Sequence, residues 1–270
     1  MSLKPAARPA RLVVKIGTSL LTRRDGHLDK PRMGRLASEL SAIQKSGTQV
    51  ILVSSGAIAA GLSEMGWTRK PSELAKKQAA AAVGQPRLME TYRRFFRRRG
   101  ISVAQLLLTR DDFESPPRSR NARTTILTLL RAGVIPIINE NDTVAVEEIR
   151  LGDNDTLAAR VAVRLQADLL VLLTDVEGLM TRHPREGRGK LIERVERLGA
   201  RIEALAHAAP GSDGGTGGMQ TKIRAARRAV SHGVPMVIAS GKRAGVLKDL
   251  LAGRPRGTFF PARRPLVGKI

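Results

Sequence analysis

Short apolar runs alternate with longer segments of helical periodicity along this chain. The apolar runs predict buried strands over residues 12–16, 50–53, 101–108, 134–138, 169–173 and 236–239. Helical spacing, as in Met33, Leu36 and Leu40, predicts helices over 33–43, from 56 onward, between 72 and 99, and over 122–131, 156–165 and 219–230. Strands that alternate with helices are typical of βαβ units. We therefore expect an α/β fold whose parallel sheet is covered by helices on both faces.

Prolines and glycines predict where these elements break. Gly84-Gln85-Pro86 indicates a break that divides the segment between 72 and 99 into two helices. Pro136 is awkward in a central strand, because it has no N–H to donate to the ladder. No internal repeat or long linker occurs. We expect a single domain over residues 11–270, preceded by a basic N-terminal arm at residues 1–10.

The composition narrows the classes of protein to which the chain can belong. It has 270 residues and no cysteine, which excludes disulfides, thiolate nucleophiles and cysteine metal sites. A cysteine-free chain fits the cytoplasm. No apolar stretch reaches the roughly 18 residues that a membrane helix needs. The basic start of the chain lacks the apolar segment of a signal peptide.

The formal net charge of +23 needs an explanation. It indicates either a nucleic-acid partner or a solvated, arginine-rich surface. Aromatic residues, which stack on the bases of single-stranded nucleic acids, are only 3% of the chain. Much of the charge lies at helical spacing, in Arg93, Arg94, Arg97, Arg98 and Arg99. We therefore favour the solvated surface and do not expect a nucleic-acid partner.

Polar residues follow several predicted strands, which is where open α/β sheets bind ligands. Lys15 lies at the end of the first strand, where it either binds a phosphate or extends to water at the sheet edge. Ser55 follows the second strand and either caps a helix or lies beside backbone amides that bind an anion. Thr174 and Asp175 end the most apolar strand and either form a cap or contact a nucleotide.

A dense group of Asn and Asp residues follows another strand. It comprises residues 139–142, which end in Asp142, and residues 152–155, which include Asn154 and Asp155. Such residues build turns, and they bind calcium in EF-hands, although the EF-hand alternation is absent. We favour a site for a ligand with an ammonium and carboxylates. There an Asp would accept from the ammonium, an Asn amide would donate to a carboxylate, and Asp155 would hold a lysine in place.

A glycine-rich segment, residues 211–218, leads into the helix that contains Lys222. Glycines let a backbone approach phosphates closely, and Lys222 would face whatever the loop holds. The alternative is a flexible surface loop with a solvated lysine. The chain has no P-loop, no strand–GxGxxG–helix unit, no protein-kinase signature and no zinc-ligand spacing of its histidines.

The ordered set of motifs resembles the glutamate 5-kinase family, a branch of the amino-acid kinases. The motifs are residues 13–19, 54–61, 82–85, 139–142, 152–155, 173–175 and 216–219, and the resemblance extends from about Arg11 to Phe260. It implies a three-layer αβα sandwich with a central, mostly parallel sheet. It also implies ATP-dependent phosphorylation of the L-glutamate side-chain carboxylate to L-glutamyl 5-phosphate, the first step of proline biosynthesis.

The resemblance implies roles for individual residues. Lys15 and Lys222 would stabilise the transferring phosphoryl group, and Asp155 would orient both lysines. ATP would be bound by Lys15, Thr174, Asp175, Thr216, Gly217, Gly218, Met219, Gln220, Thr221 and Lys222. Glutamate would be bound by Ser55, Asp142 and Asn154. Mg²⁺ would be held mostly by phosphates and water, without a protein metal site.

Family members are often homo-oligomeric and inhibited by proline, and glutamate 5-semialdehyde dehydrogenase would consume the product. Many carry an additional C-terminal PUA domain. This chain stops at Ile270, where that domain would begin, so we expect a short member or a fragment. Kinases acting on acetylglutamate, aspartate, carbamate or UMP are the nearest alternatives. A basic nucleic-acid-binding protein that keeps a kinase-like fold is another. The Asp142 and Asn154 segments, which should bind a free α-amino acid, favour glutamate.

Overall fold

The computed structural model describes residues 9–23, 25–69, 71–145, 154–182, 189–208, 218–254 and 256–262. Its strands are β1 (Arg11–Ile16), β2 (Gln49–Val53), β3 (Val103–Leu108), β4 (Ile135–Glu140), β5 (Leu169–Thr174), β6 (Met236–Ser240) and β7 (Gly257–Phe260). Its helices are α1 (Thr18–Leu21), α2 (Lys30–Lys45), α3 (Ala57–Glu64), α4 (Leu74–Arg97), α5 (Arg110–Glu114), α6 (Pro116–Arg131), α8 (Asn154–Arg164), α9 (Ala200–Ala208), α10 (Met219–Ser231) and α11 (Val246–Leu251).

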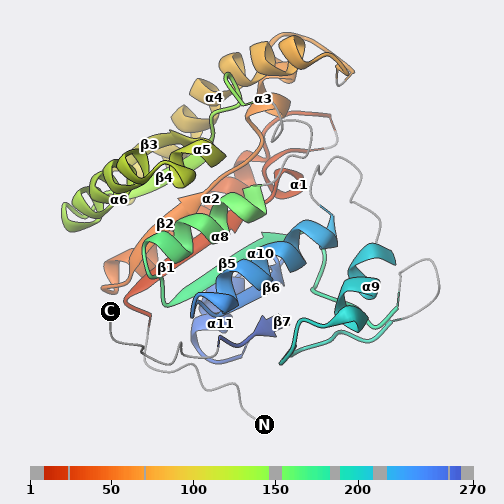
Figure 1. Ribbon diagram of the computed structural model, residues 1–270. Helices are drawn as coiled ribbons and strands as arrows, with labels where there is room; N and C mark the ends of the chain where they lie inside the picture. Colours follow the sequence, from red (N-terminus) through yellow and green to blue (C-terminus); the bar gives the residue numbers. More distant parts are fainter. Residues whose placement is uncertain are drawn as a thin grey trace.

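The strands of the described residues form one sheet in the order β3-β4-β2-β1-β5-β6-β7. All neighbouring pairs are parallel except β6 and β7, which are antiparallel. Helices lie on both faces of the sheet (Figure 1), which confirms the three-layer αβα sandwich. The short elements α1, α5, α11 and β7 were not predicted, because each is too short for its periodicity to be recognised.

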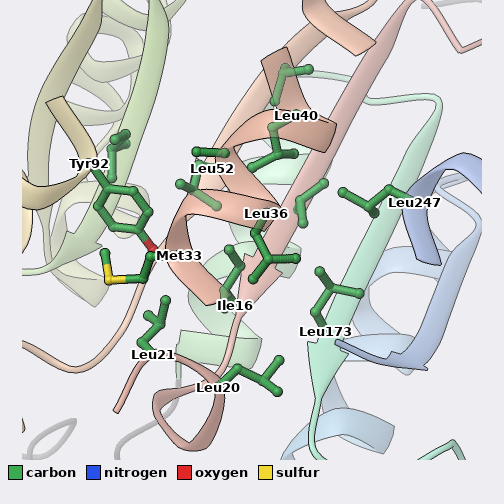
Figure 2. Close-up of a cluster of buried hydrophobic side chains, with 14 of the residues drawn as sticks. Ile16, Leu20, Leu21, Met33, Leu36, Leu40, Leu52, Tyr92, Leu173 and Leu247 are labelled. Carbon is green, nitrogen blue, oxygen red and sulfur yellow. The ribbon is translucent and has the colours of Figure 1, made fainter. Parts of the chain in front are cut away.

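The two faces of the sheet carry separate apolar cores. Successive residues of a strand point to opposite faces, so Val14 packs with α2, α4 and α11, whereas Val13 packs with α8 and α10. Figure 2 shows the first of these cores, in which Leu36 and Leu40 of α2 lie over the sheet. Both cores are almost closed to solvent, as expected for parallel strands that are buried on both faces.

The predicted helix break at Gly84-Gln85-Pro86 was wrong, because α4 continues through it. Gly84 and Gly61 let α4 and α3 approach closely: a Cβ at Gly84 would lie 1.9 Å from the backbone oxygen of Ala57. Pro86 is exposed, as is Ala82 four residues earlier, so the carbonyl that loses its helical donor lies on the side that water reaches. Tertiary packing therefore outweighs the local cost of the proline.

Pro136 lies in β4, which is flanked by β3 and β2 and is not an edge strand. The N–H of Ile135 bonds to the Ser102 carbonyl on the β3 side, so the nitrogen of the next residue faces β2. The β2–β4 register begins only after this point, at Leu52↔Ile137. The missing donor thus falls where no ladder bond is formed.

The start of the described chain is bound to the sheet. Pro9 and Ala10, the last residues of the expected arm, accept hydrogen bonds from Thr48 Oγ1 at 2.9 Å and from the N–H of Gln49 at 2.8 Å. Residues 1–8 of that arm lie outside the described residues. Among the described helices, none is long and apolar enough to cross a membrane.

Candidate active site

Two lysines share one buried carboxylate at the carboxyl edge of the sheet. Lys15 Nζ lies 2.8 Å from Asp155 Oδ1, and Lys222 Nζ lies 3.1 Å from Asp155 Oδ2. Thr221 Oγ1 is 2.7 Å from the same Oδ2. Asp155 is 1% exposed and the lysines are 7% and 6% exposed. The structure therefore brings together the three residues that the sequence assigned to catalysis.

Strand alternation and helix packing explain why these side chains meet. Lys15 lies two residues after Val13, so it faces the side of the sheet that α8 and α10 cover. The two helices lie side by side in Figure 1, and alanines that are closed to solvent line both, including Ala158 of α8 and Ala226 of α10. Asp155 is in the first turn of α8 and Lys222 in the first turn of α10. Close packing of the helices thus sets their first turns against the end of β1.

Asp155 is ionised in this arrangement. Burial alone would raise its pKa, but the charges of Lys15 and Lys222 and the hydrogen bonds to it outweigh burial and hold the pKa well below its usual range. The positive end of the α8 dipole also favours a carboxylate in the first turn. Asp155 is therefore a fixed negative charge between two cations and cannot serve as a proton acceptor near neutral pH.

Asn154, the neighbour of Asp155, belongs to a second polar group. Its Nδ2 lies 3.0 Å from the Ser54 carbonyl, 2.9 Å from Ser55 Oγ and 3.1 Å from Asn139 Oδ1. Its Oδ1 is buried and has no hydrogen-bond partner among the described residues. The sequence led us to expect an Asn that donates to a carboxylate, but the donating end of Asn154 is used within the protein.

Asp142 lines a cavity of about 250 Å³ beside this polar group. The cavity lies between α4, β3 and the segment after β4, and its wall includes Gln85, Gln105 and Glu140. Burial raises the pKa of Asp142 to about 6. The volume of the cavity suits a small ligand, because pockets for drug-sized ligands are somewhat larger, at about 300–1,000 Å³.

The residues expected to bind ATP lie in different surroundings. Thr174 ends β5 next to the end of β1, and its Oγ1 lies 3.1 Å from Asp175 Oδ1. Gly218 precedes α10, and its carbonyl lies 2.9 Å from Thr221 Oγ1. Met219 packs into the core and Gln220 Nε2 lies 2.9 Å from Nδ1 of His207 in α9, so neither side chain joins the lysine group. Thr216 and Gly217 lie outside the described residues.

Three polar residues at the site were given no individual role in the sequence interpretation. Asn139 Nδ2 donates to Gln85 Oε1 at 2.9 Å, and Gln85 Nε2 donates to Gln105 Oε1 at 3.0 Å. Gln85 offered a signal, because it shares the buried face of α4 with Leu88 and Tyr92 at helical spacing, where an apolar residue is expected. Gln105, on the edge strand, offered none.

Comparison with known proteins identifies the family. The profile of the Amino acid kinase family matches residues 10–240. The chain belongs to the amino acid kinase family. It is 53% identical over 254 residues to a protein named glutamate 5-kinase from Moorella thermoacetica, covering 94% of this chain and 67% of that relative. A glutamate 5-kinase from Caldanaerobacter subterraneus subsp. tengcongensis is 49% identical over 261 residues, covering 96% of this chain and 70% of the relative.

Solved structures agree on the fold. An isopentenyl phosphate kinase superposes with a TM-score of 0.61 at 18% identity, covering 93% of this chain and 99% of the other. UMP kinase from Bacillus anthracis superposes with a TM-score of 0.63 at 15% identity, covering 94% and 96%. At these identities the likeness concerns the fold alone, so the acceptor must be argued from the site.

Proposed function

We propose that this chain transfers the γ-phosphoryl group of ATP to the side-chain carboxylate of L-glutamate, giving ADP and L-glutamyl 5-phosphate. The observation that carries the proposal is the pair of buried lysines held by Asp155 at the carboxyl edge of the sheet. The 49–53% identity to proteins named glutamate 5-kinase supports the choice of acceptor. In biosynthetic terms, the product would enter proline synthesis.

The chemistry requires charge neutralisation more than proton transfer. A glutamate side chain with a pKa of about 4.3 is already ionised at neutral pH, so it needs no general base. One of its oxygens forms a bond to the γ-phosphorus. The bond between that phosphorus and the oxygen that bridges it to the β-phosphorus breaks, and ADP leaves with that oxygen. An anion must approach a polyanion in this step, so positioning and fixed positive charge lower the barrier.

In our proposal, Lys15 and Lys222 supply that charge, and Asp155 holds the ammonium groups in place before the substrates bind. The low pKa of Asp155 keeps it ionised, so it remains a negative counter-charge beside both ammonium groups. The nucleotide would be bound by Thr174, Asp175 and the segment 216–222. Gly218 and Met219 would contribute their peptide groups, because the Met219 side chain packs into the core. Asp142, Ser55 and Asn154 would bind glutamate.

We propose that Mg²⁺ enters with the phosphates of ATP. No group of three or more metal-ligating side chains occurs in the described part of the chain, and Asp155 is already engaged by the two lysines. A metal held mainly by phosphate oxygens and water fits this donor set. We assign no step to a protein-bound metal.

Further properties are proposed from the family resemblance. They are a cytoplasmic location, homo-oligomeric assembly, feedback inhibition by proline and consumption of the acyl phosphate by glutamate 5-semialdehyde dehydrogenase. Light scattering would measure the assembly state, and turnover at increasing proline concentration would measure inhibition.

The decisive experiment is an acceptor panel. Purified protein with MgATP is given L-glutamate, N-acetylglutamate, L-aspartate, UMP or no acceptor, and ADP release is measured with hydroxylamine present to trap an acyl phosphate. We expect ADP and hydroxamate with L-glutamate alone. Turnover with another acceptor, or ADP without hydroxamate, would refute the assigned reaction.

A further inference from the structure

The motif at residues 82–85 has no part in the proposed mechanism, yet it contributes a buried polar side chain. Gln85 is 8% exposed and hydrogen-bonds on both sides, to Gln105 and to Asn139. Asn139, 1% exposed, in turn accepts from Asn154. Four side-chain amides from β3, α4, β4 and the start of α8 therefore form one continuous hydrogen-bonded chain.

Backbone groups fix the direction of this chain. The N–H of Glu140 can only donate, and it lies 2.9 Å from Asn139 Oδ1. The oxygen end of the Asn139 amide therefore faces Glu140 and Asn154, and its NH₂ faces Gln85. The Ser54 carbonyl can only accept, so it binds the NH₂ end of Asn154. The Glu140 N–H at one end and the Ser54 carbonyl at the other therefore require the same orientation of the amides.

The orientation has a consequence for the acceptor site. With all three Nδ2 contacts made inside the protein, Asn154 presents only Oδ1, a hydrogen-bond acceptor that is buried and without a partner among the described residues. An unpaired buried acceptor is costly, and a ligand that donates a hydrogen bond relieves that cost. A carboxylate has no proton to donate, whereas an α-ammonium has three.

We propose that Gln85 and Gln105, acting through Asn139, are positioning residues that orient the Asn154 amide so that its Oδ1 accepts from the α-ammonium of the acceptor amino acid. The inference rests on the proposed function, because it concerns the same acceptor. It adds a determinant of specificity: the amide chain favours acceptors with a free ammonium and disfavours a carboxylate at that position.

The test compares Gln85→Met with Gln85→Glu. Met has a similar shape but offers Asn139 only a weakly accepting sulfur, whereas Glu keeps an oxygen there. The control is Thr91→Val, which removes another buried polar group of α4; among the described residues, its hydroxyl bonds only to the Arg87 carbonyl of its own helix. For each protein we would measure kcat, the KM values for glutamate and ATP, and the Ki of glutarate, which is glutamate without the ammonium.

We expect Gln85→Met to raise the KM for glutamate at least about fivefold, consistent with a lost buried hydrogen bond. The KM for ATP and the Ki of glutarate should change less than about twofold, because neither ligand has the ammonium that Asn154 would bind. Gln85→Glu should lie closer to the wild type than Gln85→Met, and Thr91→Val should match the wild type.

Other outcomes would overturn the inference. If Gln85 touched a substrate carboxylate directly, Gln85→Glu would be the worse variant and glutarate would be affected as much as glutamate. Equal changes for every ligand would indicate a general structural role, and no change would remove Gln85 from the site. A wild-type protein that does not turn over glutamate would instead refute the proposed function, and the ammonium-binding role with it.

Discussion

Replacement of Asp155 by Asn should destabilise the protein strongly. At about 3 Å and an effective dielectric constant of about 20, each lysine attracts the carboxylate by roughly 5 kcal/mol. The desolvation cost of the carboxylate offsets much of this. Asn has nearly the same shape but no charge, so Lys15 and Lys222 would lose the counter-charge they share. Breaking a buried pair by removing one partner costs about 3–5 kcal/mol, and we expect a loss of that size.

Urea unfolding followed by circular dichroism, at pH 7 in phosphate-free buffer, would measure this loss. Asp25→Asn is the matched control, because its pair with Arg23 is exposed (61% and 47%) and should contribute less than about 1 kcal/mol. A loss below about 1 kcal/mol for Asp155→Asn, with an unchanged denaturant slope, would refute the reasoning.

The stabilisation that Asp155 provides should also depend on pH. The folded-state pKa of Asp155 is depressed, so its contribution is fully present above its unfolded pKa of about 3.9 and is lost as the pH falls towards the folded value. The difference in unfolding free energy between wild type and Asp155→Asn should therefore be constant near neutral pH. It should shrink below about pH 4. A difference that grows on acidification would contradict the assigned charge state.

Three further predictions concern separate parts of the molecule. Lys222→Ala should lower kcat by about 10²-fold or more in a folded protein, measured by steady-state ADP release, since it removes fixed positive charge from the transition state. Asp142→Ala should mainly raise the KM for glutamate. In the wild type that KM should rise as the pH falls through about 6, because protonation of Asp142 removes an ammonium acceptor; the variant should lack this rise. Gly84→Ala should cost about 1–3 kcal/mol or more in urea unfolding, because its Cβ would meet the Ala57 carbonyl, whereas Gly199→Ala meets nothing within 4 Å and should be near neutral.

Much of the fold could be predicted because parallel strands buried on both faces are continuous apolar runs. The same reasoning found Lys15, since a lysine in such a run is out of place unless it has a partner. Sequence reasoning failed at Pro86, where it predicted a helix break. The cost of a proline there depends on which side of α4 faces water, and the packing of Gly84 against α3 determines that side. Local sequence does not contain that information.

The orientation of Asn154 was beyond the sequence for a similar reason. Its three NH₂ contacts reach residues 15 to 100 positions away, and only their joint geometry decides which end of the amide remains available. Residue types predicted that an Asn amide donates to the ligand, whereas the structure uses that NH₂ within the protein, and ligand binding by Asn154 stays a prediction. By contrast, the family resemblance implied the group of Lys15, Asp155 and Lys222, and its geometry follows from strand alternation and helix starts, which are local features.

The start of α8 serves both halves of the proposed reaction. Consecutive helical residues point about 100° apart, so Asn154 can face Ser55 and Asn139 while Asp155 faces Lys15 and Lys222. The phosphoryl side therefore depends on β1, α8 and α10, and the acceptor side on β2, β4 and α4. β1 and β2 are also paired in the sheet, but the two polar groups come together at this helix start. An uncharged substitution in the amide chain, such as Gln85→Met, changes no charged group, so it can alter acceptor binding while leaving the charge of the lysine group intact. A shift of α8 itself would disturb both.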